Sequence, residues 1–185
     1  MQHLRYPEDV PEKECATTLG FFDGVHLGHQ TILHALKKTG LPTVVMTFRV
    51  PPKYILSSTL PPPLLTSFEE KLKKLASHEI DYVYELPATH AFFSLRHSTF
   101  LEKICAHVPI KTLILGRGAS FGKERAGTEE EIKKIASAQG FVVCYLPLLM
   151  HEGKIVSSTR IRSLVEKNSL IEAKTLLKIR TREKG

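Results

Sequence analysis

The chain of 185 residues has no tryptophan and only three cysteines. Cys15, Cys105 and Cys144 are odd in number and widely separated, so they indicate neither a disulfide framework nor a zinc site. Cys105 and Cys144 lie in apolar stretches, which predicts buried thiols. Apolar runs are short as well, because none approaches the roughly 20 residues that a membrane-spanning helix needs. We therefore expect no disulfide-stapled module and no membrane span.

Residues 1–9 lack an apolar stretch followed by a small-residue cleavage site, so they do not resemble a signal peptide. A cytoplasmic protein is the resulting expectation. Acidic residues are also in deficit, with 19 Asp and Glu against 26 Lys and Arg, for a net charge of +7. This charge favours anionic partners such as nucleotides, phosphates or nucleic acid, although a lysine-rich surface that only aids solubility is the commoner explanation.

Apolar, β-branched runs alternate with amphipathic stretches along the chain. The runs predict strands at residues 16–22, 43–48, 81–86, 111–116 and 141–146. Helices are predicted at 29–38, 67–78, around 100–105, at 128–139 and from residue 169. Three of these helices start with capping-box spacing, namely Ser67/Glu70, Thr128/Glu131 and Ser169/Glu172. We predict one α/β domain, a doubly wound parallel sheet in a three-layer α/β/α arrangement.

Two stretches break this alternation, the proline-rich residues 51–63 and the glycine-containing residues 117–127. Each follows a predicted strand, so each should lie over the carboxyl edge of the sheet, where ligands bind. A plain surface connection and a substrate lid are about equally plausible for both.

Two histidines, His26 and His29, follow the first predicted strand, and Gly24 and Gly28 allow the backbone to turn tightly beside them. A helix start offers unpaired N–H groups and a positive dipole end, which suit a phosphate. Imidazoles there can donate hydrogen bonds as negative charge builds during phosphoryl transfer. An isolated histidine would more often cap or pack, but a glycine-flanked pair favours catalysis.

A second motif lies near the end of the chain, at residues 155–162. Ser157, Ser158 and Thr159 offer hydroxyl groups at a helix start, and Arg162 follows in the first turn. A guanidinium makes paired, charge-assisted bonds to phosphate oxygens, so this motif suits a polyphosphate. An ordinary serine cap with a solvent-facing arginine is the alternative, and the presence of the histidine pair disfavours it.

The string from Phe22 to Gln30, FDGVHLGHQ, resembles the FMN adenylyltransferase domain of bacterial bifunctional riboflavin kinase/FAD synthetases. That family belongs to the HxGH nucleotidyltransferase superfamily and has a Rossmann-like fold. Residues 155–162, IVSSTRIR, are similar to its ISSTxIR element, and residues 121–127 extend the resemblance. The resemblance implies transfer of the adenylyl group of ATP to FMN, giving FAD and pyrophosphate.

The resemblance also implies roles for individual residues. The implied catalytic residues are His26, His29 and Arg162. The implied nucleotide-binding residues are Gly20, Phe21, Phe22, Asp23, Gly24, Gly28, Ser157, Ser158 and Thr159. The implied acceptor-loop residues are Phe48, Pro51, Gly118, Phe121, Lys123 and Arg125. Mg²⁺ is expected to be held mainly by the ATP phosphates, with no protein ligand.

Three positions depart from the family pattern: Pro51 replaces a histidine, Gly118 an amide or carboxylate, and Ala119 an aromatic residue. All three lie on the loops expected to hold the flavin. Two alternatives therefore stay open, an HxGH transferase with another phosphate-bearing acceptor and an inactive nucleotide- or RNA-binding regulator. An RNA binder should interleave aromatic residues with a basic stripe, and because the sequence has none, nucleic acid is not an expected partner.

The expected domain covers residues 1–178, and the charged residues 179–185 resemble a tail or a truncated linker. The bifunctional family continues into a riboflavin kinase barrel after the ISSTxIR helix. No such module follows in this sequence, so riboflavin phosphorylation is not expected from these residues.

Overall fold

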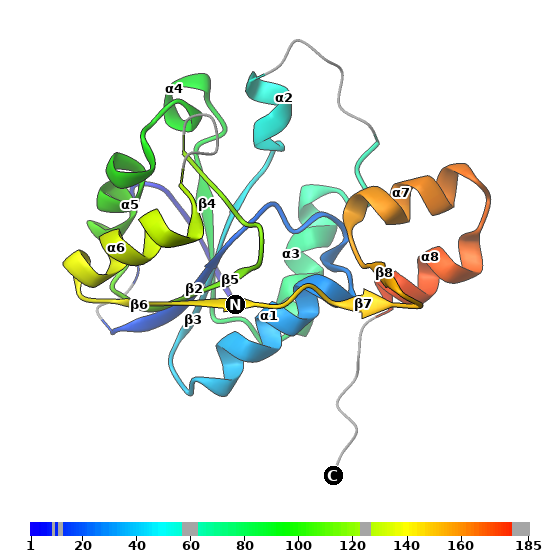
Figure 1. Ribbon diagram of the computed structural model, residues 1–185, viewed down its shortest axis with the longest axis horizontal. Coiled ribbons are helices and arrows are strands. Elements are labelled where there is room, and N and C mark those ends of the chain that lie inside the picture. The colour runs from blue at the N-terminus through cyan, green and yellow to red at the C-terminus, as the bar shows by residue number, and fades with distance from the viewer. Residues whose placement is uncertain (9, 11–12, 57–62, 123–126, 179–185) are drawn as a thin grey trace.

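The computed structural model describes residues 1–8, 10, 13–56, 63–122 and 127–178 (Figure 1). Six parallel strands form one sheet in the order β1, β4, β3, β2, β5, β6. The strands are β1 Gln2–Arg5, β2 Cys15–Leu19, β3 Thr43–Phe48, β4 Tyr82–Leu86, β5 Ile110–Gly116 and β6 Val142–Leu146. The predicted doubly wound parallel sheet is confirmed, with its topological switch point between β2 and β5.

Helices cover both faces of the sheet, as the three-layer prediction requires. One face packs against α1 Leu27–Lys38 and α3 Phe68–Ser77, and the other against α4 His90–Phe93, α5 His97–Cys105 and α6 Glu129–Gln139. The run of apolar residues in β3 is explained by its neighbours on both sides. Val44 and Met46 belong to one core cluster, and Val45 belongs to the other. Both faces of this strand are buried.

A smaller unit lies beside the sheet (Figure 1). It consists of the hairpin β7 Met150–His151 and β8 Lys154–Ile155, followed by α7 Ser158–Glu166 and α8 Leu170–Leu177. Its apolar cluster includes Leu27 at the start of α1 together with Val156, Ile161 and Leu176. This packing anchors the second motif against the helix that carries the histidines.

The structure corrects several predicted boundaries. Strand β1 was missed, because its four residues at the sheet edge alternate too briefly to give a periodic signal. The first predicted strand ends at Leu19 rather than residue 22, because Phe22 and Val25 have φ values of 56° and 45°. Phe22 is the N-cap of a 3₁₀ turn, η1 Asp23–Val25, and Val25 is its last residue before the chain enters α1.

The helix caps and loops also differ in part from those predicted from the sequence. Ser67 and Glu70 form a complete capping box, and the Thr128 hydroxyl accepts from the Glu131 N–H. The predicted Ser169 cap is wrong, because Ser169 makes no side-chain cap bond and Glu172 pairs with Arg160 instead. The predicted loop at 51–63 contains a short helix, α2 Pro52–Leu56, and residues 57–62 and 123–126 lie outside the described residues.

Cys15 is buried and Cys105 partly buried, but the predicted burial of Cys144 is wrong. Cys144 lies on the edge strand β6, which leaves its side chain exposed. In the described part of the chain, no helix combines the length and apolar character that crossing a bilayer requires.

Candidate active site

The two sequence motifs meet beyond the carboxyl end of β2. The Ser158 hydroxyl donates to the Asp23 carbonyl oxygen at 3.1 Å. Arg162 Nη1 donates to the Asp23 carboxylate at 2.7 Å, and only 3 % of the Asp23 side chain is exposed. The loop after β2 and the start of α7 are therefore joined through Asp23.

The histidines form a stacked pair at the start of α1. His26 is the N-cap, and its Nδ1 accepts a hydrogen bond from the His29 N–H at 3.3 Å. The two rings lie 3.7 Å apart with 15° between their planes, and Phe22 packs on the other side of His29 at 4.8 Å. His26 thus has a capping role, which was one of the alternatives, while its ring remains in contact with His29.

Burial keeps both imidazoles neutral at pH 7. The pKa of His26 is lowered to about 4 by burial, against a smaller opposing effect of its backbone hydrogen bond. The pKa of His29 is lowered well below its usual value by burial and by the nearby His26 and Lys71. His29 Nδ1 is buried with no hydrogen-bond partner, so we place the proton of the neutral ring on Nε2. A neutral donor suits a phosphate whose charge increases during reaction.

Acid should destabilise the fold through His26. An unfolded histidine has a pKa of about 6.5, so between that pH and 4 the unfolded chain binds more protons than the native one. Stability is therefore lost as the pH falls through this window, by roughly 3 kcal/mol for His26. In His26→Asn, which keeps a capping side chain, urea unfolding should depend less on pH between 7 and 4. His34→Asn, at an exposed position of α1, is the control, and identical pH dependence in all three proteins would contradict the prediction.

Glycines in this region have identifiable steric roles. A Cβ atom on Gly28 would lie 3.2 Å from the His26 ring and 3.2 Å from the Val156 carbonyl oxygen. Gly28 therefore allows the second motif to approach the histidine pair. Gly24 has a φ of +77°, and a Cβ there would lie 2.8 Å from Leu177. A larger residue at either position would separate α1 from the α7–α8 unit.

Asp23 joins three segments of the chain. Its Oδ1 accepts from the backbone N–H groups of Leu65 and Thr66 at 2.9 and 3.3 Å, while Oδ2 accepts from Arg162. Asp23 was predicted as a nucleotide-binding residue, but its carboxylate is already bonded to the protein on both oxygens. The structure thus gives Asp23 the loop-positioning role and Arg162 a fixed orientation.

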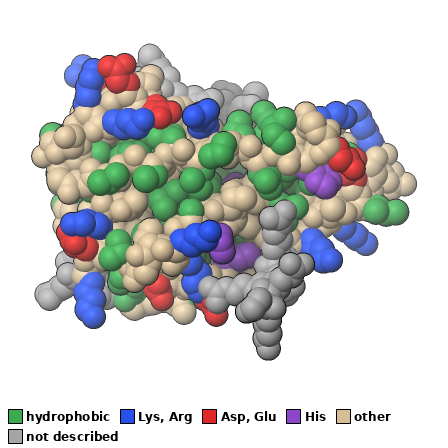
Figure 2. Space-filling model, turned by 60° about the horizontal axis from the view of Figure 1, so that its bottom comes forward, with side chains coloured by type: hydrophobic (Ala, Val, Ile, Leu, Met, Phe, Trp, Pro, Cys, Tyr) green, Lys and Arg blue, Asp and Glu red, His purple; other side chains and the backbone are tan. Residues whose placement is uncertain are grey.

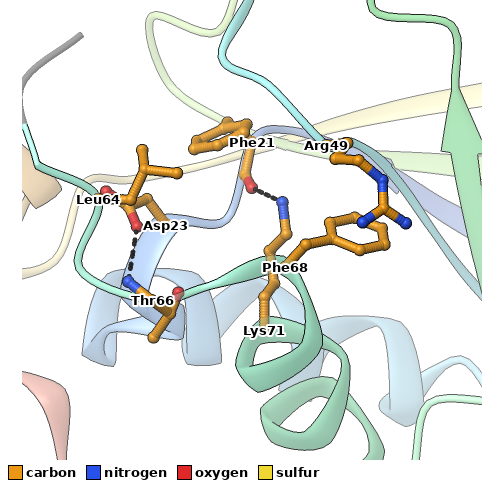
Figure 3. A pocket seen from close by; sticks show the side chains of 7 residues that line it. All are labelled: Phe21, Asp23, Arg49, Leu64, Thr66, Phe68 and Lys71. Carbon is orange, nitrogen blue, oxygen red and sulfur yellow. Dashed lines mark hydrogen bonds between the residues drawn. The ribbon is translucent and has the colours of Figure 1, made fainter.

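A shallow hollow lies next to Asp23 (Figure 3). Its lining residues are Phe21, Asp23, Arg49, Leu64, Thr66, Phe68 and Lys71, and it offers about 160 Å³ including its open mouth. Small-molecule sites usually offer 300–1,000 Å³, so the hollow is too small for a whole nucleotide. Arg49 lies over the Phe68 ring at 4.1 Å and pairs with Glu69 and Glu85.

Lys71 in this hollow is a site residue that the sequence analysis missed. It is 2 % exposed, and burial lowers its pKa to about 7, although Asp23 and Glu85 oppose the shift. A signal was available in the sequence: Lys71 falls on the apolar face of its helix, between Phe68 and Leu75. A lysine at such a core position indicates a specific partner for its ammonium group.

The remaining predicted nucleotide-binding residues lie near this surface. Ser157 caps α7 by accepting from the Arg160 N–H, and Thr159 is exposed. The Phe21 carbonyl oxygen accepts from Lys71, and Phe22 is buried against His29. Gly20 leaves room for the Phe22 ring, which would lie 3.0 Å from a Cβ atom at that position.

The predicted acceptor-loop residues are more widely spread over the structure than the predicted nucleotide-binding residues. The Phe48 ring is buried in the core 5.0 Å from Phe93, so only its backbone faces the hollow. Pro51 is half-buried at the start of α2, and Phe121 packs 5.3 Å from Phe100. Gly118 has a φ of +79° with open space around it. Lys123 and Arg125 lie outside the described residues.

The sequence profile of the FAD synthetase family matches residues 9–160. The chain belongs to the FAD synthetase family. The bifunctional riboflavin kinase/FMN adenylyltransferase of Buchnera aphidicola subsp. Schizaphis graminum is 34 % identical over 168 residues, which are 88 % of this chain and 54 % of that protein. The Escherichia coli K12 protein of the same name is 31 % identical over 173 residues, or 91 % of this chain and 55 % of its own length. This FAD synthetase family member thus spans about half the length of these relatives.

Solved structures agree with the fold. A Streptococcus pneumoniae structure described as a macrolide-efflux protein superposes with a TM-score of 0.84 at 26 % identity, covering 96 % of this FAD synthetase family chain and 61 % of the other. A pantoate-beta-alanine ligase from Francisella tularensis superposes with a TM-score of 0.59 at 13 % identity, covering 98 % and 81 %. At that identity, the second likeness shows the shared Rossmann-like fold alone.

Proposed function

We propose that this chain transfers the adenylyl group of ATP to FMN, producing FAD and pyrophosphate. The observation that carries this proposal is the contact between the two motifs of the family, with a neutral histidine pair on one side and Arg162 on the other. The two sides are joined through Asp23, whose carbonyl oxygen accepts from Ser158 and whose carboxylate accepts from Arg162. Such a donor set suits a polyphosphate that gains negative charge in the transition state.

In the proposed reaction, a phosphate oxygen of FMN attacks the α-phosphorus of ATP. A P–O bond forms between the two phosphates, the bond between the α- and β-phosphates breaks, and its electron pair leaves with pyrophosphate. The FMN phosphate is largely a dianion near pH 7, so the protein needs neither a nucleophile nor a strong base. His26 and His29 would stabilise the α- and β-phosphates, and Ser157, Ser158, Thr159 and Arg162 the β- and γ-phosphates.

Mg²⁺ bound to the ATP phosphates would neutralise part of their charge. The described part of the chain contains no group of three or more His, Cys, Asp or Glu side chains that could hold a metal ion. Asp23, the carboxylate nearest the histidines in sequence, is bonded to Arg162 and two backbone N–H groups. The donors here fit the anionic nucleotide, so we assign the ion to the phosphates.

We further propose that residues 1–178 form the catalytic domain and that this domain works in the cytoplasm.

The test is incubation with ATP, MgCl₂ and FMN, with FAD detected by mass spectrometry and pyrophosphate release measured in parallel. FAD formation at a rate proportional to enzyme supports the proposal. If pyrophosphate appears only with another phosphate compound from an acceptor panel, an HxGH transferase with a different acceptor replaces it. ATP binding without turnover on any acceptor would favour a regulator.

An RNA-binding regulator should carry a basic stripe. In the face shown in Figure 2, basic side chains are scattered around an apolar band and form no single stripe.

Restoring a polar side chain at position 118 should strengthen acceptor binding. Gly118 replaces the amide or carboxylate of the family pattern, and its left-handed φ of +79° is one that asparagine tolerates. A new hydrogen bond of about 1 kcal/mol would lower the KM for FMN about fivefold in Gly118→Asn. Gly140→Asn is a matched control, since Gly140 has a φ of +81° and similar open space at the end of α6. An unchanged KM in both variants would remove residue 118 from the acceptor site.

A further inference from the structure

Lys71 makes an unusual set of hydrogen bonds for a buried lysine. Its Nζ donates to the carbonyl oxygens of Phe21 and Phe48 at 2.9 and 2.8 Å and to Thr47 Oγ1 at 3.2 Å. All three acceptors are neutral. The ammonium also lies 4.1 Å from the centre of the Phe21 ring. Because burying an ammonium is costly, a leucine or methionine would serve packing alone more cheaply.

The bonded carbonyls lie where two neighbouring strands separate. The bond from the Gly20 N–H to the Met46 carbonyl oxygen, 3.1 Å long, extends the pairing of β2 and β3 just past the end of β2. One residue later, Lys71 bridges the two segments, and the Thr47 hydroxyl also donates to the Phe21 carbonyl oxygen at 3.1 Å. Lys74, one turn along α3, donates to the Gly24 carbonyl oxygen at 2.9 Å. Helix α3 therefore fixes residues 20–24 from two positions, and Figure 3 shows the first, the bond from Lys71 to the Phe21 carbonyl oxygen.

We propose that Lys71 is a positioning residue, whose ammonium fixes the loop leading to the histidine pair relative to the end of β3, which leads to the predicted acceptor loop. The inference rests on the proposed function, since it concerns the alignment of the two substrates. Lys71 acts through the backbone of Phe21 and Phe48 and not on the reacting atoms. Misplacement of reacting groups by about 1 Å can lower the reaction rate 100-fold, so loss of this alignment should lower kcat measurably.

Titration of Lys71 supplies a readout that packing would not give. Its pKa of about 7 means that the ammonium loses a proton, and one of its three donors, within an accessible pH range. The charged and titratable groups facing it are Asp23 on η1, Glu85 on β4, Arg49 after β3 and His29 on α1. The pKa shifts of Glu85 and His29 are downward and that of Arg49 is upward, all away from the range of pH 6–9. Burial also lowers the pKa of Lys74, which donates to the Gly24 carbonyl oxygen, so a change over residues 20–24 can come from either lysine. A change over residues 47–49 in this range reports Lys71.

The experiment compares wild type with Lys71→Met, Lys71→Arg and the control Lys73→Met, at an exposed position of the same helix. Hydrogen exchange, corrected for intrinsic rates, is measured over residues 20–24 and 47–49 from pH 6 to 9. Steady-state FAD formation is measured in parallel.

We expect Lys71→Met to lower kcat by about 10- to 100-fold with a smaller change in KM for ATP. Exchange should be faster at both segments, and its dependence on pH should disappear over residues 47–49. Lys71→Arg should restore part of kcat, and Lys73→Met should match wild type.

Wild-type kcat and exchange in Lys71→Met would overturn the proposal. If Lys71→Met does not fold, the wild-type pH series over residues 47–49 decides: protection that weakens above pH 7 supports the proposal, and protection independent of pH overturns it. Failure of the proposed function gives a different result, since wild type would then form no FAD while exchange still reports on Lys71.

Discussion

Replacing His29 with alanine is expected to lower kcat by a factor of about 10² to 10³, with little change in affinity for ATP. The structure supplies the physical reason, because the ring is neutral, is stacked 3.7 Å from His26 and has a buried, unpartnered Nδ1. In the proposed function its remaining N–H donates to a phosphate, and that hydrogen bond strengthens as charge develops. Removal of one such donor in other enzymes costs about 2.7–4 kcal/mol of barrier.

Steady-state kinetics with ATP and FMN, together with binding of a non-hydrolysable ATP analogue, measure the two effects separately. His34→Ala is the control, because residue 34 lies on the same helix in an exposed position. An unchanged kcat in His29→Ala would show that His29 only packs against Phe22 and His26. A loss confined to KM would assign it to ground-state binding, which also contradicts the prediction.

The fold was predictable because its strongest signals are local. The buried central strands are continuous apolar runs, and the expected caps Ser67 and Thr128 mark helix starts that the structure confirms. What escaped prediction depends on tertiary contact. Strand β1 is defined by its pairing with β4, and Glu172 leaves its expected capping box because Arg160 is near. No local pattern encodes either partner.

The same distinction applies to the site. The sequence predicted that residues near 26 and 158 share one ligand, and the bond between Ser158 and Asp23 brings their backbones together. It did not predict that Asp23 and Arg162 bond to each other, because both were assigned separately to the nucleotide. Lys71 was missed for a related reason: two backbone carbonyl oxygens and one hydroxyl oxygen accept hydrogen bonds from it, and all three lie outside its own helix.

The bond between Asp23 and Arg162 predicts a loss of both stability and activity in Arg162→Ala. Asp23 is nearly fully buried, so removing the guanidinium leaves an uncompensated carboxylate, which typically costs 3–5 kcal/mol. Because 21 % of the Arg162 side chain is exposed and water can replace part of the lost bond, we expect about 3 kcal/mol in urea unfolding. Arg162→Lys should retain most of this stability, since an ammonium still pairs with Asp23. It should nevertheless lower kcat, because it loses the planar fork that binds phosphate.

A double-mutant cycle with Asp23→Asn separates the two roles of the arginine. If the ion pair accounts for the stability loss, Arg162→Ala should cost much less in the Asp23→Asn background than in wild type. The cost in kcat should remain in both backgrounds, because the phosphate contact does not depend on the charge of Asp23. Additive stability losses would show that the two residues do not stabilise each other. Full activity in a folded Arg162→Lys protein would remove the arginine from the polyphosphate site and leave it as the structural partner of Asp23.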